Sequence, residues 1–254
     1  MRDIGSAGLI LIAVGAGCGF THGQLGDDGA DPGADADVAA LRWEETQAGA
    51  STSSGQLVVS TSTAITAIAD QLYIAVIDQN RDESSALTAV TGMGLSWTRV
   101  SQQCSTADKI LLDVWTARGV PTGNDVVSAT FDTAPDAAAI VVLRYSGASA
   151  TPFAKIASAN NVGASDTTCG GSGSTAPSVT LELSTPALVL AMFGHKNEVL
   201  VPRTGMIVRG EALGDGESTA GVEVIEAQLP AGATDVSGTL DSSADWAAIT
   251  VAVR

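Results

Sequence analysis

The chain has 254 residues, of which 45% are apolar and only 4% aromatic, and its formal net charge at pH 7 is −16. This acidic balance excludes proteins that bind nucleic acid through clustered Lys and Arg, and it disfavours electrostatic docking on anionic lipid. The length is enough for one large all-β domain or two small ones. Because much of the apolar content is alanine and valine, the composition favours closely packed sheets over a large ligand cavity.

The N-terminus has the pattern of an export signal. Residues 4–14 are apolar apart from Gly and Ser, and they follow a short start with one basic residue, Arg2. Such a run is too short to span a bilayer core of ~30 Å, but it has the length of a signal-peptide core. We therefore expect residues 1–17 to be a signal peptide.

The end of this segment resembles the lipobox of bacterial lipoproteins. The family has small residues before an obligatory cysteine, as in Gly15-Ala16-Gly17-Cys18, although Gly15 stands where the family prefers leucine. The resemblance implies that Cys18 is lipidated, so that the membrane partner is reached through acyl chains. Gly19, rather than an aspartate, follows the cysteine, which implies the outer membrane or the cell surface.

A spacer is predicted over residues 18–50. Aspartates at 27, 28, 31, 35 and 37 lie among Gly, Ala and Pro, and such a segment buries too little surface to offset its ordering entropy. We interpret it as a flexible, self-repelling tether. Calcium binding is the alternative for its carboxylates, but the spacing is not that of an EF-hand.

The remainder, residues 51–254, has the alternation of antiparallel strands. Apolar side chains share one face in Ser178–Leu183, in 109–116 and in 249–253, and Gly, Pro, Asn and Asp clusters separate such segments. We count roughly eleven or twelve strands and no long amphipathic helix. Short strands at this spacing predict a β-sandwich or barrel.

The two parts of this domain repeat one another. Four matching pairs, which stay in order along the chain, are Leu72-Tyr73-Ile74-Ala75 with Leu188-Val189-Leu190-Ala191, Asp113-Val114 with Glu223-Val224, 127–132 with 236–241, and 138–140 with 247–249. We infer half-units of about 55–147 and 178–254. Two such halves packed face to face form one sandwich, which we favour; two tandem small sandwiches are the alternative.

This domain also resembles jelly-roll-like modules of bacterial and phage surface proteins. The similar elements are Gly94-Leu95-Ser96-Trp97-Thr98-Arg99-Val100, Arg144-Tyr145-Ser146-Gly147, and the final segment 246–254. These motifs are structural, so the resemblance implies the fold and carries no catalytic residue.

Two cysteines remain once Cys18 is assigned to the anchor. Cys104 follows the Trp97 segment, and Cys169 lies in a glycine-rich stretch between the halves. Because export exposes thiols to oxidising conditions, we expect a Cys104–Cys169 disulfide; two separate thiols are the alternative.

Catalytic and metal-binding patterns are weak, so we expect no enzyme, no cofactor and no metal site. His195 has no partner motif and is expected at the surface or rim, and Glu223 and Glu226 are expected on an outward strand face. Trp115 faces away from Ile110, Leu112 and Val114, so it and Tyr145 are the candidate ligand contacts.

The sequence therefore predicts a non-catalytic surface lipoprotein with a structural, adhesive or interaction role and a glycan or protein partner. The alternative is a carbohydrate- or calcium-binding β-sandwich module.

Overall fold

Alternating apolar residues form antiparallel strands throughout the part of the chain that the computed structural model describes. That part comprises residues 41–80, 85–105, 109–161, 163–164, 169, 172–196, 200–202, 204–214 and 219–254. The predicted signal peptide, Cys18 and most of the predicted tether lie outside these residues. The described segments contain seventeen strands and no helix. They therefore contain no helix that could span a membrane.

The first half of the domain consists of two sheets. Its larger sheet has the order β1-β8-β3-β6-β5 and its smaller sheet the order β2-β7-β4. The strands are β1 (Arg42–Ala50), β2 (Val58–Ser60), β3 (Leu72–Asn80), β4 (Leu87–Thr91), β5 (Thr98–Cys104), β6 (Ile110–Ala117), β7 (Ser128–Phe131) and β8 (Ala137–Ser146). An order of 1-8-3-6 facing 2-7-4 is that of a jelly roll.

The second half repeats this topology. Its larger sheet has the order β10-β9-β17-β12-β15-β14 and its smaller sheet the order β11-β16-β13. The strands are β9 (Phe153–Asn160), β10 (Gly163–Ala164), β11 (Ser178–Leu183), β12 (Ala187–His195), β13 (Leu200–Pro202), β14 (Ile207–Leu213), β15 (Gly221–Leu229), β16 (Gly232–Leu240) and β17 (Trp246–Val253). Apart from the short β10, each strand has a counterpart in the first half, from β1 with β9 to β8 with β17. The predicted all-β fold, an antiparallel sandwich built from two related halves, is confirmed, and each half has by itself the strand order of a jelly roll.

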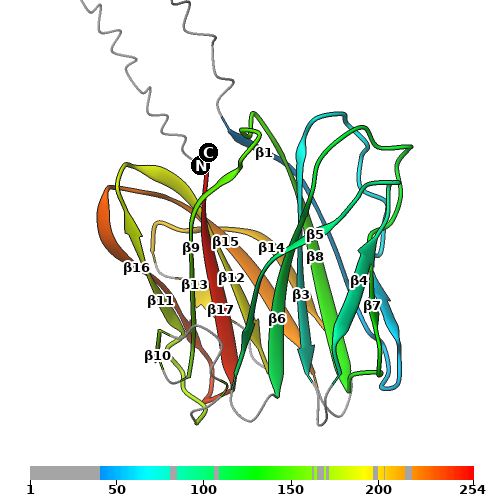
Figure 1. The fold of residues 1–254 in the computed structure, drawn as a ribbon. Helices are drawn as coiled ribbons and strands as arrows, with labels where there is room; N and C mark the ends of the chain where they lie inside the picture. The colour runs from blue at the N-terminus through cyan, green and yellow to red at the C-terminus, as the bar shows by residue number, and fades with distance from the viewer. Residues whose placement is uncertain are drawn as a thin grey trace, which may run out of the picture. The chain divides into compact units, whose positions relative to one another are not determined.

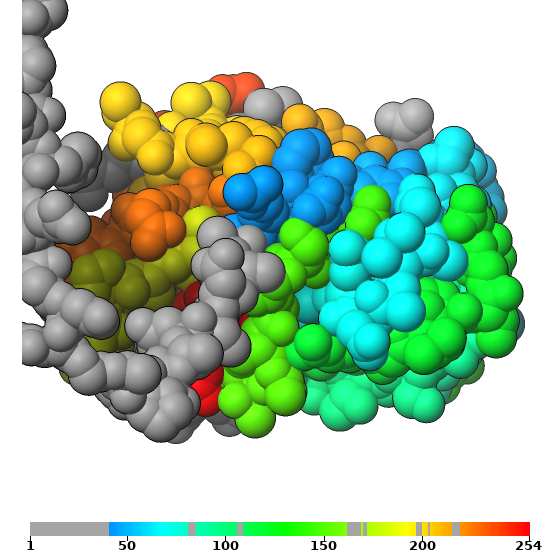
Figure 2. All heavy atoms as spheres, turned by 90° about the horizontal axis from the view of Figure 1, so that it is seen from above, coloured from blue at the N-terminus to red at the C-terminus, as the bar shows by residue number. Residues whose placement is uncertain are grey.

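The halves pack face to face through their larger sheets, which gives four layers (Figure 1). A central core between the larger sheets combines residues of both halves, including Ile74, Val76, Met192 and Ile249. Two further cores lie between the larger and smaller sheet of each half. In the view along the strands the first half occupies one side and the second half the other (Figure 2). The two alternatives for the repeat therefore occur together, because the larger sheets form a shared sandwich and each half is also a small sandwich.

An approximate twofold relation connects the halves. Strand β1 packs on β14, and the equivalent contact joins β9 to β5. The relation also brings together two positions that match in the repeat, since a Cβ on Gly194 would lie 2.4 Å from Asp78 Oδ1. Such an exchange of equivalent surfaces is what a symmetric dimer interface shows, here within one chain.

Two predicted boundaries differ from the observed ones. We expected the tether to run to residue 50, but Arg42–Ala50 pairs with β8 as an edge strand. Its polar composition suggested a tether, whereas Glu45 is in fact paired with Arg144 at 3.1 Å. The second half likewise begins before residue 178, because β9 pairs with β17.

Candidate functional site

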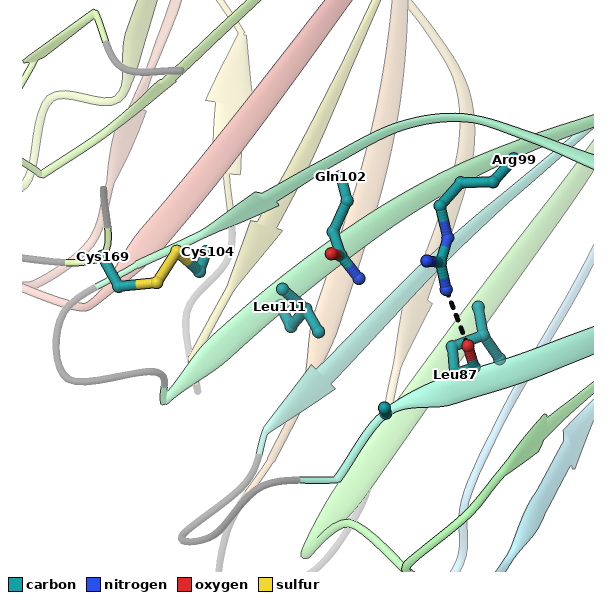
Figure 3. A pocket seen from close by; sticks show the side chains of 7 residues that line it. Leu87, Arg99, Gln102, Cys104, Leu111 and Cys169 are labelled. Atoms are coloured by element: carbon teal, nitrogen blue, oxygen red, sulfur yellow. Dashed lines mark hydrogen bonds between the residues drawn. A yellow bond between two sulfur atoms is a disulfide. The ribbon is translucent and has the colours of Figure 1, made fainter. Parts of the chain in front are cut away.

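A cavity lies where the smaller sheet of the first half ends. That sheet stops at β4, whereas the larger sheet continues through β6 to β5, so part of the outer face of β5 and β6 has no strand above it. The cavity there has a volume of about 300 Å³. We call it the β4–β5 cleft, and it is lined chiefly by Leu87, Arg99, Gln102, Cys104, Leu111 and Cys169 (Figure 3).

One buried carboxylate organises the polar side chains of the cleft. Asp113 on β6 is fully buried, and Arg99 Nε on β5 lies 2.8 Å from its Oδ1. Gln102 Nε2, also on β5, lies 3.2 Å from each oxygen of the same carboxylate. A buried charge is tolerated where a cation and hydrogen bonds compensate it, and Asp113 has both.

Arg99 is held from two further directions. Its Nη2 donates to the backbone oxygen of Leu87 on β4 at 2.6 Å, and its guanidinium carbon lies 5.0 Å from the centre of the Trp115 ring. The bond to Leu87 satisfies a carbonyl at the free edge of the smaller sheet, where a further strand would otherwise pair. The side chain still has 38% of its surface exposed, so a fixed guanidinium borders the cleft.

The predicted disulfide forms one end of the cleft. Cys104, at the end of β5, is bonded to Cys169 with the two Cα atoms 5.2 Å apart. Cys104 is buried and Cys169 exposed. Because Cys169 belongs to the segment before β11, the bond ties a connector of the second half to the first half, and residues of both halves border the cleft.

Neither of the two candidate ligand contacts lines the cleft, although Trp115 lies next to it beneath Arg99. Trp115 points away from the central core, as predicted, but Arg99 covers its ring and its Nε1 is buried. Tyr145 is fully buried, and its hydroxyl donates to Glu226 Oε2 at 2.9 Å, so the expectation of a ligand contact there is wrong. Tyr145 lies on β8, which is covered on both faces. The alternation of apolar residues along the sequence does not show that both faces of a strand are buried.

The equivalent surface of the second half has a different chemistry. In the two registers, Gln102 and Asp113 correspond to Glu211 and Glu223, and Val208 stands where the first half has Arg99. Desolvation and the charge of Glu211 raise the pKa of Glu223 to about 8. Both halves therefore have a carboxylate at this position, but Val208 gives the second half no cation where the first half has Arg99.

Other ionisable groups that we expected at the surface are buried. His195, expected at the rim, is 1% exposed, and Glu223 and Glu226, expected on an outward face, are 2% and 7% exposed. Glu226 is paired with Arg209 at 2.5 Å. These residues lie in layers covered from both sides. In the described part of the chain no group of three or more His, Cys, Asp and Glu side chains is arranged to hold a metal ion.

Sequence reasoning missed Arg99, Gln102 and Asp113 as members of a site. The available signal was Asp113 itself, a charged residue between Leu112 and Val114 in an otherwise apolar strand. Its partners come from the adjacent strand, which the sequence pattern does not pair with it.

Comparison of the chain with protein-family models, with curated proteins and with solved structures gives no match. The residues described above therefore supply the grounds for a functional proposal.

Proposed function

We propose that the chain is an exported, lipid-anchored protein that displays a double jelly roll for non-catalytic binding or adhesion at the outer membrane or cell surface. Export and lipid anchoring are supported by the apolar run that precedes Gly15-Ala16-Gly17-Cys18. Anchoring of this kind uses acyl chains and needs no membrane-spanning segment.

The observation that carries a binding role is the arrangement of the β4–β5 cleft. Arg99 and Asp113 neutralise each other, and Arg99 is fixed by Leu87 and Trp115. A general acid or base would need a titratable group free to exchange a proton with a bound molecule. The charged groups of this cleft, Arg99 and Asp113, form an ion pair with each other. This arrangement is better suited to binding a molecule than to transferring a proton.

The anchor is tested by labelling cells with a palmitate analogue. We expect the wild-type chain to be labelled and Cys18→Ser to lose the label, because the thiol of Cys18 is the attachment point. The variant with both Cys104→Ser and Cys169→Ser is the matched control and should keep the label. Labelling that persists in Cys18→Ser would refute the anchor.

A carbohydrate-binding module is the second candidate, and the cleft is the observation that favours it over calcium. The cleft offers a guanidinium and an amide beside apolar side chains, whereas calcium prefers six to eight oxygen ligands. A sugar site combines hydrogen-bonding groups with apolar surface, which is the composition found here.

A further inference from the structure

We propose that the β4–β5 cleft binds one uncharged sugar residue, whose neighbouring hydroxyl groups bridge Arg99 and Gln102. This inference rests on the second candidate function, to which it adds a site, a stoichiometry and a charge class for the ligand. It is independent of the lipid anchor.

Both binding groups are held in place before any ligand arrives. The single carboxylate of Asp113 accepts from Arg99 Nε and from Gln102 Nε2, so the polar ends of the two side chains lie close together. Trp115 and Leu87 restrain the guanidinium further. Side chains fixed in this way lose little conformational entropy on binding, which favours affinity for a small ligand.

The groups that remain unused are complementary to a pair of hydroxyls. A carboxylate only accepts hydrogen bonds, so Gln102 donates its Nε2 to Asp113 and presents Oε1 as an acceptor. The Nη1 group of Arg99 has no hydrogen-bond acceptor among the described residues. A vicinal diol can accept from Arg99 through one oxygen and donate to Gln102 through the other.

Charge favours a neutral ligand over an anionic one. The cation of Arg99 is cancelled by Asp113, so the cleft has little positive potential of its own. The chain as a whole has a net charge of −16, which repels anions at long range. A uronate or another carboxylate would therefore bind less well than an uncharged sugar.

The size of the cavity limits the length of the ligand, and the composition of the second half limits the number of sites. A volume of about 300 Å³ is at the lower limit of small-molecule sites, which suits one ring rather than a chain of rings. The outer face of β14 and β15 cannot form the same site, because Val208 replaces Arg99 and Glu211 replaces Gln102. We expect one sugar per chain, bound by the first half.

The test is NMR titration of the full ¹⁵N-labelled chain carrying Cys18→Ser, which keeps it unlipidated. The probes are glucose, galactose, mannose, N-acetylglucosamine and glucuronate. The reporter is the indole N–H resonance of Trp115, assigned with Trp115→Phe, because this ring stacks on Arg99. We expect at least one uncharged sugar to shift it saturably, with one site per chain, and glucuronate to shift it less.

Two matched variants locate the site. Gln102→Met removes the Oε1 acceptor with little change in volume, and it also removes the Nε2 bonds to Asp113, which keeps Arg99 as its partner. The loss of one hydrogen bond to the sugar should weaken binding about fivefold. Gln47→Met, at a half-buried hydrogen-bonded glutamine on β1, should leave binding unchanged. The proposal is overturned if no uncharged sugar shifts the Trp115 resonance, if glucuronate alone does so, or if both variants bind like the parent chain. Palmitate labelling of Cys18 does not depend on sugar binding. The proposal of the lipid anchor and the proposal of the sugar site can therefore be refuted independently of each other.

Discussion

Asp113 and Glu223 occupy equivalent positions in the two halves, but only Asp113 has a cation beside it. Arg99 lies 2.8 Å from Asp113, whereas the residue facing Glu223 across the strand pair is Glu211. Burial without a counter-charge favours the neutral acid, which is why the pKa of Glu223 is raised to about 8. Two residues of the edge strand differ between the halves, since Val208 and Glu211 stand where the first half has Arg99 and Gln102, and the charge of Glu211 adds to the effect of burial on Glu223.

At the scale of this residue we predict that wild-type stability declines as pH rises from about 4.5 to about 8, and that Glu223→Gln reduces the decline. Because the folded-state pKa lies above the unfolded value, the folded chain binds the proton more tightly. The resulting stabilisation is complete below about 4.5 and is lost through about 8. Urea unfolding at several pH values measures this.

Glu182→Gln, on the exposed face of β11, is the control for that series and should leave the slope as it is in the wild type. A Glu223→Gln profile that overlays the wild-type profile at every pH would contradict the assignment. Sequence periodicity could not have shown this behaviour, since it depends on which strand lies next to β15.

At the scale of elements, the placement of β5 determines the cleft. In a jelly roll the fifth strand can continue the smaller sheet, but here it pairs with β6, with a bulge between Arg99 and Ser101. The equivalent strand β14 has a bulge between Val208 and Gly210. Bulges re-aim side chains next to functional surfaces, and in β5 the irregularity adjoins Arg99.

The disulfide stabilises this arrangement of elements. It closes a loop with a sequence separation of 65, for which the chain-entropy estimate is about 4 kcal/mol. We predict that the double variant Cys104→Ser/Cys169→Ser loses up to ~4 kcal/mol of unfolding free energy, measured by urea denaturation. Reducing agent should destabilise the wild-type chain comparably and the double variant not at all. An equal effect of reducing agent on both chains would contradict the prediction.

At the scale of the whole molecule, the two halves share the central core between their larger sheets. The central strands of the larger sheets are covered on both faces, so every residue of β3 and of β17 is buried. The halves fit closely at this contact, because Gly194 leaves room for Asp78, and burial raises the pKa of Asp78 well above its usual range. If the two halves separated, each would expose much of the apolar surface that now forms the central core.

We therefore predict that both halves unfold in one cooperative transition. Calorimetry should give equal calorimetric and van't Hoff enthalpies. Ile249→Ala, in the second half, removes a fully buried side chain from the central core and should cost about 2–5 kcal/mol. Hydrogen exchange should then accelerate in β3 of the first half as well as in β17. Two separate transitions, or acceleration confined to the second half, would show that the halves are independent domains.

The sequence by itself determined the all-β class and the internal repeat, because these follow from local alternation and from order along the chain. It led us to expect the Cys104–Cys169 disulfide, with two separate thiols as the alternative, and the structure shows the bond. The sequence also indicated the face on which Trp115 lies. Only the tertiary structure decided that Tyr145, His195 and Glu226 are buried and that Arg99 and Gln102 meet at Asp113. The physical reason is that alternation distinguishes the two faces of a strand but does not say what covers them. That depends on sheets and strand neighbours brought together from distant parts of the chain.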